Sequence, residues 1–188
     1  PQYWMENVPE GLDAPGRWLL DTRHSRLYLW PRNDGPPTGI LAPRLTEMVR
    51  FEPGPDGTPC RHIAIEGVTF RHGDRLSWPR PRRALQHDWQ LYDWPDAMVR
   101  LRGARDIAIR DCRFVDAGAT GLRMDGFAAG SAVEGCVFET LGGNAVAIIG
   151  DEPGLGERTH HNRVCGNRIR DIGRVEHPRI TKRDAKVI

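Results

Sequence analysis

The stretch Ile107-Ala108-Ile109-Arg110-Asp111-Cys112-Arg113-Phe114 places apolar residues at alternate positions on either side of a two-residue corner. The same pattern begins at residue 63, and shorter versions begin at residues 133 and 164. A second run of alternating residues accompanies each copy, at residues 49–52, 99–102, 122–125 and 146–149. Equivalent positions are 23 residues apart from Val99 to Leu122 and 24 apart from Leu122 to Val146.

A period of about two dozen residues with short alternating strands is typical of a right-handed parallel β-helix. Each coil then contributes about three strands, and equivalent positions stack about 4.8 Å apart on successive coils. A leucine-rich repeat has a similar period, but its leucine and asparagine signature is absent. A β-sandwich explains short strands but not a superposable period. We therefore predict an all-β protein in which residues 46–188 form about four coils, interrupted by an inserted loop at residues 74–98.

Residues 1–45 do not follow the repeat. Residues 18–21 and 27–31 are two apolar runs separated by a polar turn, which predicts a β-hairpin in a small separate β module. The composition suits a folded chain, with 188 residues, 39% hydrophobic and 28% charged. No apolar run approaches the roughly 18–20 residues that span a membrane. The net charge of +2 comes from interspersed arginines and acids, which argues against nucleic-acid binding.

The charged residues of the second run should face outward. Leu122 and Met124 point into the core, so Arg123 and Asp125 point the other way. Alignment of the coils gives two outward columns: Arg50, Arg100, Arg123 and Ala147, and beside them Glu52, Arg102, Asp125 and Ile149. Such a stripe can hold an extended anionic or hydroxyl-rich ligand. It can equally be a set of cross-strand ion pairs that join Arg102 to Glu52 and to Asp125.

Stacking also places Cys112, Cys136 and Asn167 at one corner of successive coils. We expect an inward ladder there, with the Asn167 amide bonded to backbone groups at the bend. Two alternatives remain for the thiols, a disulfide between Cys112 and Cys136 or stacked buried thiols that pack as small hydrophobic groups. The four cysteines have no metal-ligand spacing.

The inserted loop is rich in tryptophan. Trp78, Trp89 and Trp94 lie in a polar, proline-rich stretch just before the strand that carries the outward columns, so we expect the loop to overhang that face. Aromatic faces beside hydrogen-bonding groups suit sugar rings. One interpretation is a wall of a glycan cleft in which these residues act with Arg100, Arg123 and His160. The other is a self-packed lid.

The hairpin motif resembles a known family. Residues 6–7, 12–21 and 27–31 look like the β module inserted early in glycoside hydrolase family 141, and residues 61–71 are similar to the coil that follows it there. Arg17 stands where that family commonly has an acid. The resemblance implies a secreted or periplasmic carbohydrate-active hydrolase without a metal or organic cofactor, acting on oligo- or polysaccharide. Coils in such enzymes are more numerous, so we expect the chain to be part of a longer protein.

Glycoside hydrolysis usually needs two carboxyl groups, about 5–5.5 Å apart for retention or roughly 6.5–9.5 Å apart for inversion. The candidates are Asp125, Asp151 and Glu152. The alternative interpretation, which the residues favour, is that they are ordinary turn carboxylates beside Gly126 and Gly150. His160 and His161 should point to opposite sides of a strand and so not share a ligand. The alternative functions are a non-catalytic polysaccharide-binding or adhesin-type β-helix, and a polysaccharide lyase. A lyase would need a calcium-binding acidic cluster that the sequence does not show.

Overall fold

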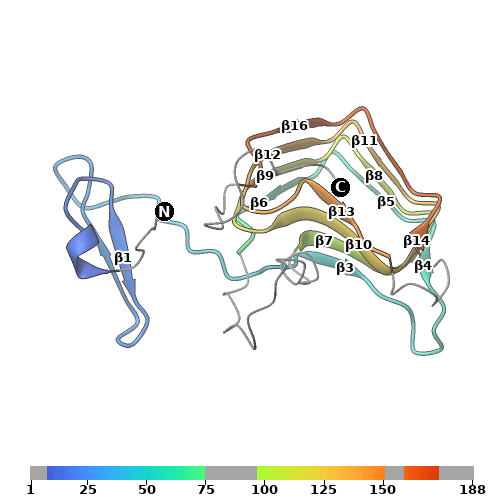
Figure 1. Ribbon diagram of the computed structural model, residues 1–188, viewed down its shortest axis with the longest axis horizontal. Helices are drawn as coiled ribbons and strands as arrows, with labels where there is room; N and C mark the ends of the chain where they lie inside the picture. The colour runs from blue at the N-terminus through green and yellow to red at the C-terminus, as the bar shows by residue number, and fades with distance from the viewer. Residues whose placement is uncertain (1–7, 75–96, 151–158, 174–188) are drawn as a thin grey trace, which may run out of the picture. The chain divides into compact units, whose positions relative to one another are not determined.

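The computed structural model describes residues 8–74, 97–150 and 159–173. The chain divides into two compact units, Pro1–Ala42 and Pro43–Ile188, which we call the hairpin unit and the coil unit (Figure 1). The division falls close to residue 45, where the repeats are predicted to begin. Within the described residues, no helix is long and apolar enough to cross a membrane.

The hairpin unit contains a short 3-10 turn, η1 (Pro9–Gly11), followed by strands β1 (Trp18–Asp21) and β2 (Arg26–Leu29). The two strands are antiparallel and pair Trp18 with Leu29 and Asp21 with Arg26. Asp21 shapes the turn because its Oδ1 accepts hydrogen bonds from the backbone N–H groups of Arg23 at 3.0 Å and His24 at 3.1 Å. An aspartate that bonds its own turn in this way favours chain reversal.

The described part of the coil unit forms three parallel sheets, and the chain visits them in turn. The first contains β3 (Val49–Phe51), β7 (Ala97–Arg105), β10 (Thr120–Ala129) and β13 (Val146–Ile148), with β4 (Cys60–Arg61) and β14 (Thr159–His160) at one end. The second contains β5 (Ala64–Glu66), β8 (Ala108–Arg110), β11 (Ala132–Glu134) and β15 (Arg163–Cys165). The third contains β6 (Thr69–Arg71), β9 (Arg113–Ala117), β12 (Val137–Leu141) and β16 (Arg168–Arg170). This all-β arrangement of parallel sheets is compatible with the predicted parallel β-helix.

The strand register joins the positions that the repeat makes equivalent. Val49 pairs with Val99, and Leu122 pairs with both Val99 and Val146. Inward residues therefore stack in columns: the ring centroids of Phe70 and Phe114 are 5.0 Å apart, and those of Phe114 and Phe138 are 4.7 Å apart. Ile169 pairs with Phe138 and continues this column on the next coil.

The strand that follows the inserted loop begins earlier than predicted. Ala97 and Met98 were expected in the loop, but both belong to β7 and are fully buried. Their apolar side chains join the sheet as soon as the chain returns to it.

Left-handed backbone residues mark the corners between sheets. Each corner repeats them on successive coils: His62, Asp106, Gly130 and His161 at the first, Gly67, Asp111, Gly135 and Gly166 at the second, and His72, Asp116, Thr140 and Asp171 at the third. Gly130 and Gly135 have a further reason to be glycine. A Cβ at either position would lie 2.5 Å from an aspartate Oδ1 of the preceding coil. The two-residue corner of the sequence pattern is the second of these tight left-handed bends.

Polar side chains complete the corners. The Asn167 side chain accepts a hydrogen bond from the Cys136 N–H at 2.8 Å and donates to the Val133 carbonyl at 2.9 Å, as predicted. Asn162 bonds Ser131 and Ala128 in the same way at the preceding corner. Cys112 and Cys136 are buried free thiols, so the disulfide alternative is not realised. Burial raises the pKa of the Cys136 thiol.

Candidate functional site

The predicted outward column of arginines lies on the first sheet. The register pairs Arg50 of β3 with Arg100 of β7, and Arg100 with Arg123 of β10. Neighbouring strands are about 4.8 Å apart, so three guanidinium groups in one column repel each other unless acids lie between them.

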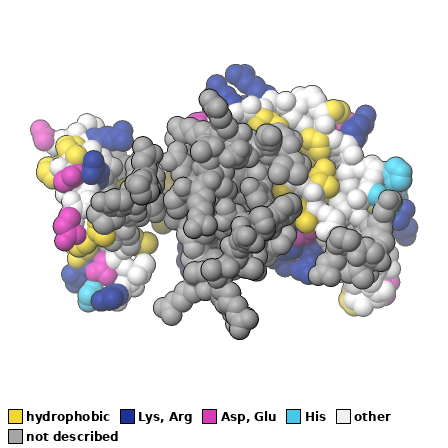
Figure 2. Space-filling model, in the orientation of Figure 1, with side chains coloured by type: hydrophobic (Ala, Val, Ile, Leu, Met, Phe, Trp, Pro, Cys, Tyr) yellow, Lys and Arg dark blue, Asp and Glu magenta, His cyan; other side chains and the backbone are white. Residues whose placement is uncertain are grey.

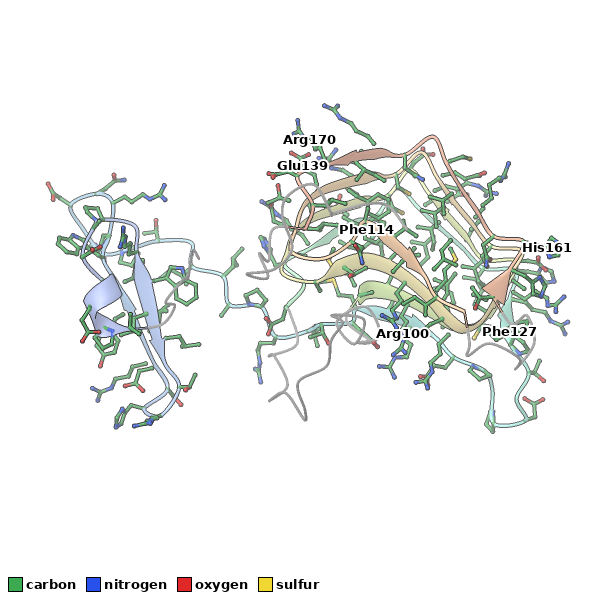
Figure 3. The ribbon with its side chains drawn as sticks, in the orientation of Figure 1. Arg100, Phe114, Phe127, Glu139, His161 and Arg170 are labelled. Carbon is green, nitrogen blue, oxygen red and sulfur yellow. The ribbon has the colours of Figure 1, made fainter. Side chains whose placement is uncertain are left out.

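Asp125 and Glu47 supply those acids. The Asp125 carboxylate accepts from Arg100 Nε at 3.0 Å and Arg100 Nη2 at 2.7 Å, and from Arg123 Nε at 2.8 Å. Arg100 Nη1 also donates to Glu47 Oε1 at 3.2 Å. Arg50 pairs with Glu47 as well, and with Glu52 at 3.0 Å. We call Glu47, Arg100, Arg123 and Asp125 the buried network (Arg100 is labelled in Figure 3).

Burial distinguishes this network from the stripe that the sequence predicts. Arg100, Arg123 and Asp125 point away from the core, but their exposed fractions are only 6%, 4% and 7%. They were expected to be available to ligand, and the structure encloses them. Four charged groups can be buried together because each carboxylate oxygen is bonded to a guanidinium.

The predicted ion pairs through Arg102 are wrong. Among the described residues Asp125 pairs with Arg100 and Arg123, and Glu52 pairs with Arg50. For Asp125 the reason lies in β10, whose register against β7 shifts between Met124 and Phe127. A bulge of this kind redirects side chains from the positions that simple alternation assigns.

The electrostatics of Asp125 bear on its predicted catalytic role. Burial acts to raise the pKa of its carboxyl, but the hydrogen bonds from Arg100 and Arg123 outweigh burial and lower that pKa. The group is therefore an ionised carboxylate over the whole neutral range. A general acid must hold a proton, so the surroundings of Asp125 do not suit that role.

His160 does not behave as alternation predicts. Its Nδ1 lies 2.6 Å from Nδ1 of His161, and the two rings meet edge to face with centroids 4.8 Å apart. The expectation that they point to opposite sides is wrong because His161 has a left-handed φ of 55°, which ends the strand geometry at that residue. Within the described residues, no three His, Cys, Asp or Glu side chains are grouped to hold a metal ion.

The other predicted site residues lie outside the described residues. These are Asp151 and Glu152 among the carboxylates and Trp78, Trp89 and Trp94 among the aromatic residues. The structure therefore does not test the roles predicted for these five residues.

Sequence reasoning missed Glu47 and an ion-pair row on the second sheet. In this row Arg110 donates to Glu66 at 2.9 Å and to Glu134 at 3.4 Å, and Arg163 also pairs with Glu134. We call Glu66, Arg110, Glu134 and Arg163 the surface ladder. The signal was available, because Glu66, Arg110 and Glu134 occupy equivalent positions with alternating charge. Glu47 gives a weaker signal, an acid three residues before Arg50 and outside any repeat.

The hairpin unit exposes aromatic side chains. Tyr28 and Trp30 alternate along the β2 strand and its extension, so they share one face, and their exposed fractions are 41% and 45%. Backbone hydrogen bonds place Trp30 opposite Arg17, whose guanidinium pairs with Asp13 at 2.5 Å. Trp18, with an exposed fraction of 63%, pairs with Leu29 and lies on the other face.

No protein-family model matches the chain, and no curated protein or solved structure matches it. The resemblance to glycoside hydrolase family 141 therefore stays a prediction that no comparison supports.

Proposed function

We propose that the protein is a right-handed parallel β-helix protein that binds polysaccharide, with Tyr28 and Trp30 of the hairpin unit as a sugar-stacking face. The exposure of these two aromatic side chains on one face is the observation that carries the proposal. Sugar rings present apolar C–H faces and hydroxylated edges, and they pack on aromatic rings that have hydrogen-bonding groups nearby.

The local geometry supports this use. Tyr28 and Trp30 are two residues apart on an extended strand, which spaces their attachment points by about 7 Å. Arg17 and Asp13 lie at the Trp30 end and can bond hydroxyl groups. A hairpin of two strands cannot bury both of its faces in its own structure. Exposed aromatic groups on such a module are candidates for contact with a ligand.

Glycoside hydrolysis has less support from the described residues than polysaccharide binding has. Asp125 is ionised and both of its oxygens are bonded to arginines, so it has no proton to donate as a general acid. The remaining predicted carboxylates, Asp151 and Glu152, lie outside the described residues. Glycosidase activity therefore rests on the family resemblance alone.

The experiment compares two tryptophans on opposite faces of one hairpin. We expect Trp30→Ala to weaken binding to the polysaccharides that the wild-type chain retains in affinity electrophoresis by about tenfold, as loss of one aromatic contact implies. Trp18→Ala is the matched control and should bind like the wild type. Trp30→Phe should restore most of the binding.

Two results would overturn the proposal. One is a wild-type chain that binds none of a panel of neutral and acidic polysaccharides. The other is an equal loss in Trp30→Ala and Trp18→Ala, which would assign both residues to hairpin stability. Thermal unfolding of each variant shows whether the hairpin unit remains folded.

A further inference from the structure

A second group of side chains lies on the outer face of the first sheet, at the end where β4, β7, β10 and β14 meet. The register aligns Arg61 with Arg105, Arg105 with Ala129, and Ala129 with His160. The residue after each of these positions is a left-handed corner residue, which adds His62 and His161 to the same edge. We call Arg61, His62, Arg105, His160 and His161 the cationic corner.

The two arginines of this corner differ from those of the buried network and the surface ladder. Arg61 and Arg105 are exposed and lie on adjacent strands, about 4.8 Å apart. Within the described residues neither forms an ion pair, whereas Arg100 and Arg110 each bond two carboxylates. Two like charges side by side on a sheet repel each other, and an anion bound between them would turn that repulsion into attraction.

Phe127 holds one of the arginines in place. The guanidinium of Arg105 lies over the Phe127 ring, 5.5 Å from its centroid. This cation–π contact restrains the side chain without neutralising its charge, so the N–H groups at its edge remain available. Figure 3 shows Phe127 and His161 at the same end of the coil unit.

The histidines extend the same edge. Nδ1 of His160 and Nδ1 of His161 are 2.6 Å apart, so a ring N–H of one histidine is donated to the other and holds the two rings together at this edge. The carboxylate of this corner belongs to Asp106, whose Oδ2 lies 3.8 Å from His62 Nδ1. In Figure 2 histidine and basic side chains gather at this edge of the coil unit.

We propose that the cationic corner binds the carboxylate or sulfate groups of an acidic polysaccharide, which narrows the ligand class of the proposed function and rests on it. Guanidinium groups pair with such anions through two parallel N–H···O bonds. Nucleic acid is the less suitable polyanion. Arg105 covers one face of Phe127, and the basic groups at this corner do not form the long stripe that follows a nucleic-acid backbone.

The test uses the full chain and four probes: polygalacturonate for carboxylates, dextran sulfate for sulfates, unmodified dextran as the neutral polymer and a single-stranded oligonucleotide. The variant is Arg61→Gln with Arg105→Gln. The control is Arg113→Gln with Arg168→Gln, because these arginines are also exposed and form no ion pair within the described residues, but lie on the third sheet. Both variants lose the same charge.

We expect the wild-type chain to bind polygalacturonate or dextran sulfate, and whichever polymer binds identifies the anionic group. The Arg61 and Arg105 variant should bind at least tenfold more weakly, and the control should stay within about twofold, since a charge-assisted contact contributes more than a general field. Equal losses in the two variants would overturn the proposal. Tighter binding of the oligonucleotide with the same dependence on Arg61 and Arg105 would overturn it in favour of nucleic acid.

The two proposals fail separately. Binding of a neutral polysaccharide that depends on Trp30, without any gain from anionic groups, would refute the cationic corner alone. A chain that binds no polysaccharide of either kind would refute the proposed function and the corner with it.

Discussion

The buried network and the surface ladder use the same arrangement in different surroundings. In both, an arginine on one coil bonds acids from other coils, Arg100 with Glu47 and Asp125, and Arg110 with Glu66 and Glu134. The exposed fraction of the side chain is 7% for Arg100 and 45% for Arg110. The comparison shows that similar bond geometry does not imply similar energetics, because a buried charge has lost its hydration and an exposed one keeps it.

The largest predicted effect comes from breaking the buried network. Asp125→Ala leaves Arg100 and Arg123 without their shared carboxylate in a place that water does not hydrate well. Removal of one partner from a buried pair typically costs about 3–5 kcal/mol, and we expect a loss of that size in the free energy of unfolding. Urea denaturation of the wild type and the variant measures it. A loss below about 1 kcal/mol would mean that the network is effectively solvated.

Acid should weaken the same contact in the unmodified protein. The pKa of Asp125 is lowered from its ordinary value of 3.8 on folding. A lowered pKa contributes stability that is fully present above the unfolded value and is lost as the pH falls through the folded value. We therefore expect the difference in unfolding free energy between the wild type and Asp125→Asn to be constant near neutral pH and to shrink below about pH 4.

This pH experiment has an internal control. Asp21 and Asp56 also have lowered pKa values, through hydrogen bonds from His24 and Thr58, but both side chains are present in the wild type and in the variant. Their contributions cancel in the difference. A difference that grows on acidification would contradict the assignment of Asp125 as an ionised partner of the arginines.

The sequence predicted the column structure of the coil unit well because that structure depends on repetition. Alternation sets which residues face the core, and the repeat spacing sets which coil positions meet, so Phe114 was placed beside Phe70 and Phe138 from spacing alone. The hydrogen bonds of Asn167 were predicted in the same way, since its side chain bonds backbone groups at the last described copy of the second corner, as the stacked pattern requires.

The charged site was less predictable because it depends on departures from repetition. Because the register shifts after Met124, Asp125 pairs with Arg100 instead of Arg102. The left-handed φ of His161 places its ring against that of His160. Glu47 lies before the first repeat, where alignment of coils assigns no partner. The alternation of apolar and polar residues also cannot predict that an outward face is buried. It shows which side chains point toward the core, but not what covers the opposite face of the sheet.

The smallest predicted effect is on the surface ladder. Glu66→Gln removes one acid from Arg110, which remains bonded to Glu134 and open to solvent. Hydration replaces the lost pair, and ordering two exposed side chains offsets most of the attraction. We expect an unfolding midpoint that matches the wild type at physiological salt, and any residual difference should vanish near 1 M salt, where the Debye length is about 3 Å. Asp125→Asn and Glu66→Gln both replace a carboxylate by its amide, but Asp125 bonds two arginines and Glu66 bonds one. A loss for Asp125→Asn well beyond twice that for Glu66→Gln therefore reports the effect of burial. Equal losses of unfolding free energy in the two variants would contradict this prediction. They would show that the surface ladder acts as a coupled network, in which the exposure of one side chain does not determine how much stability its removal costs.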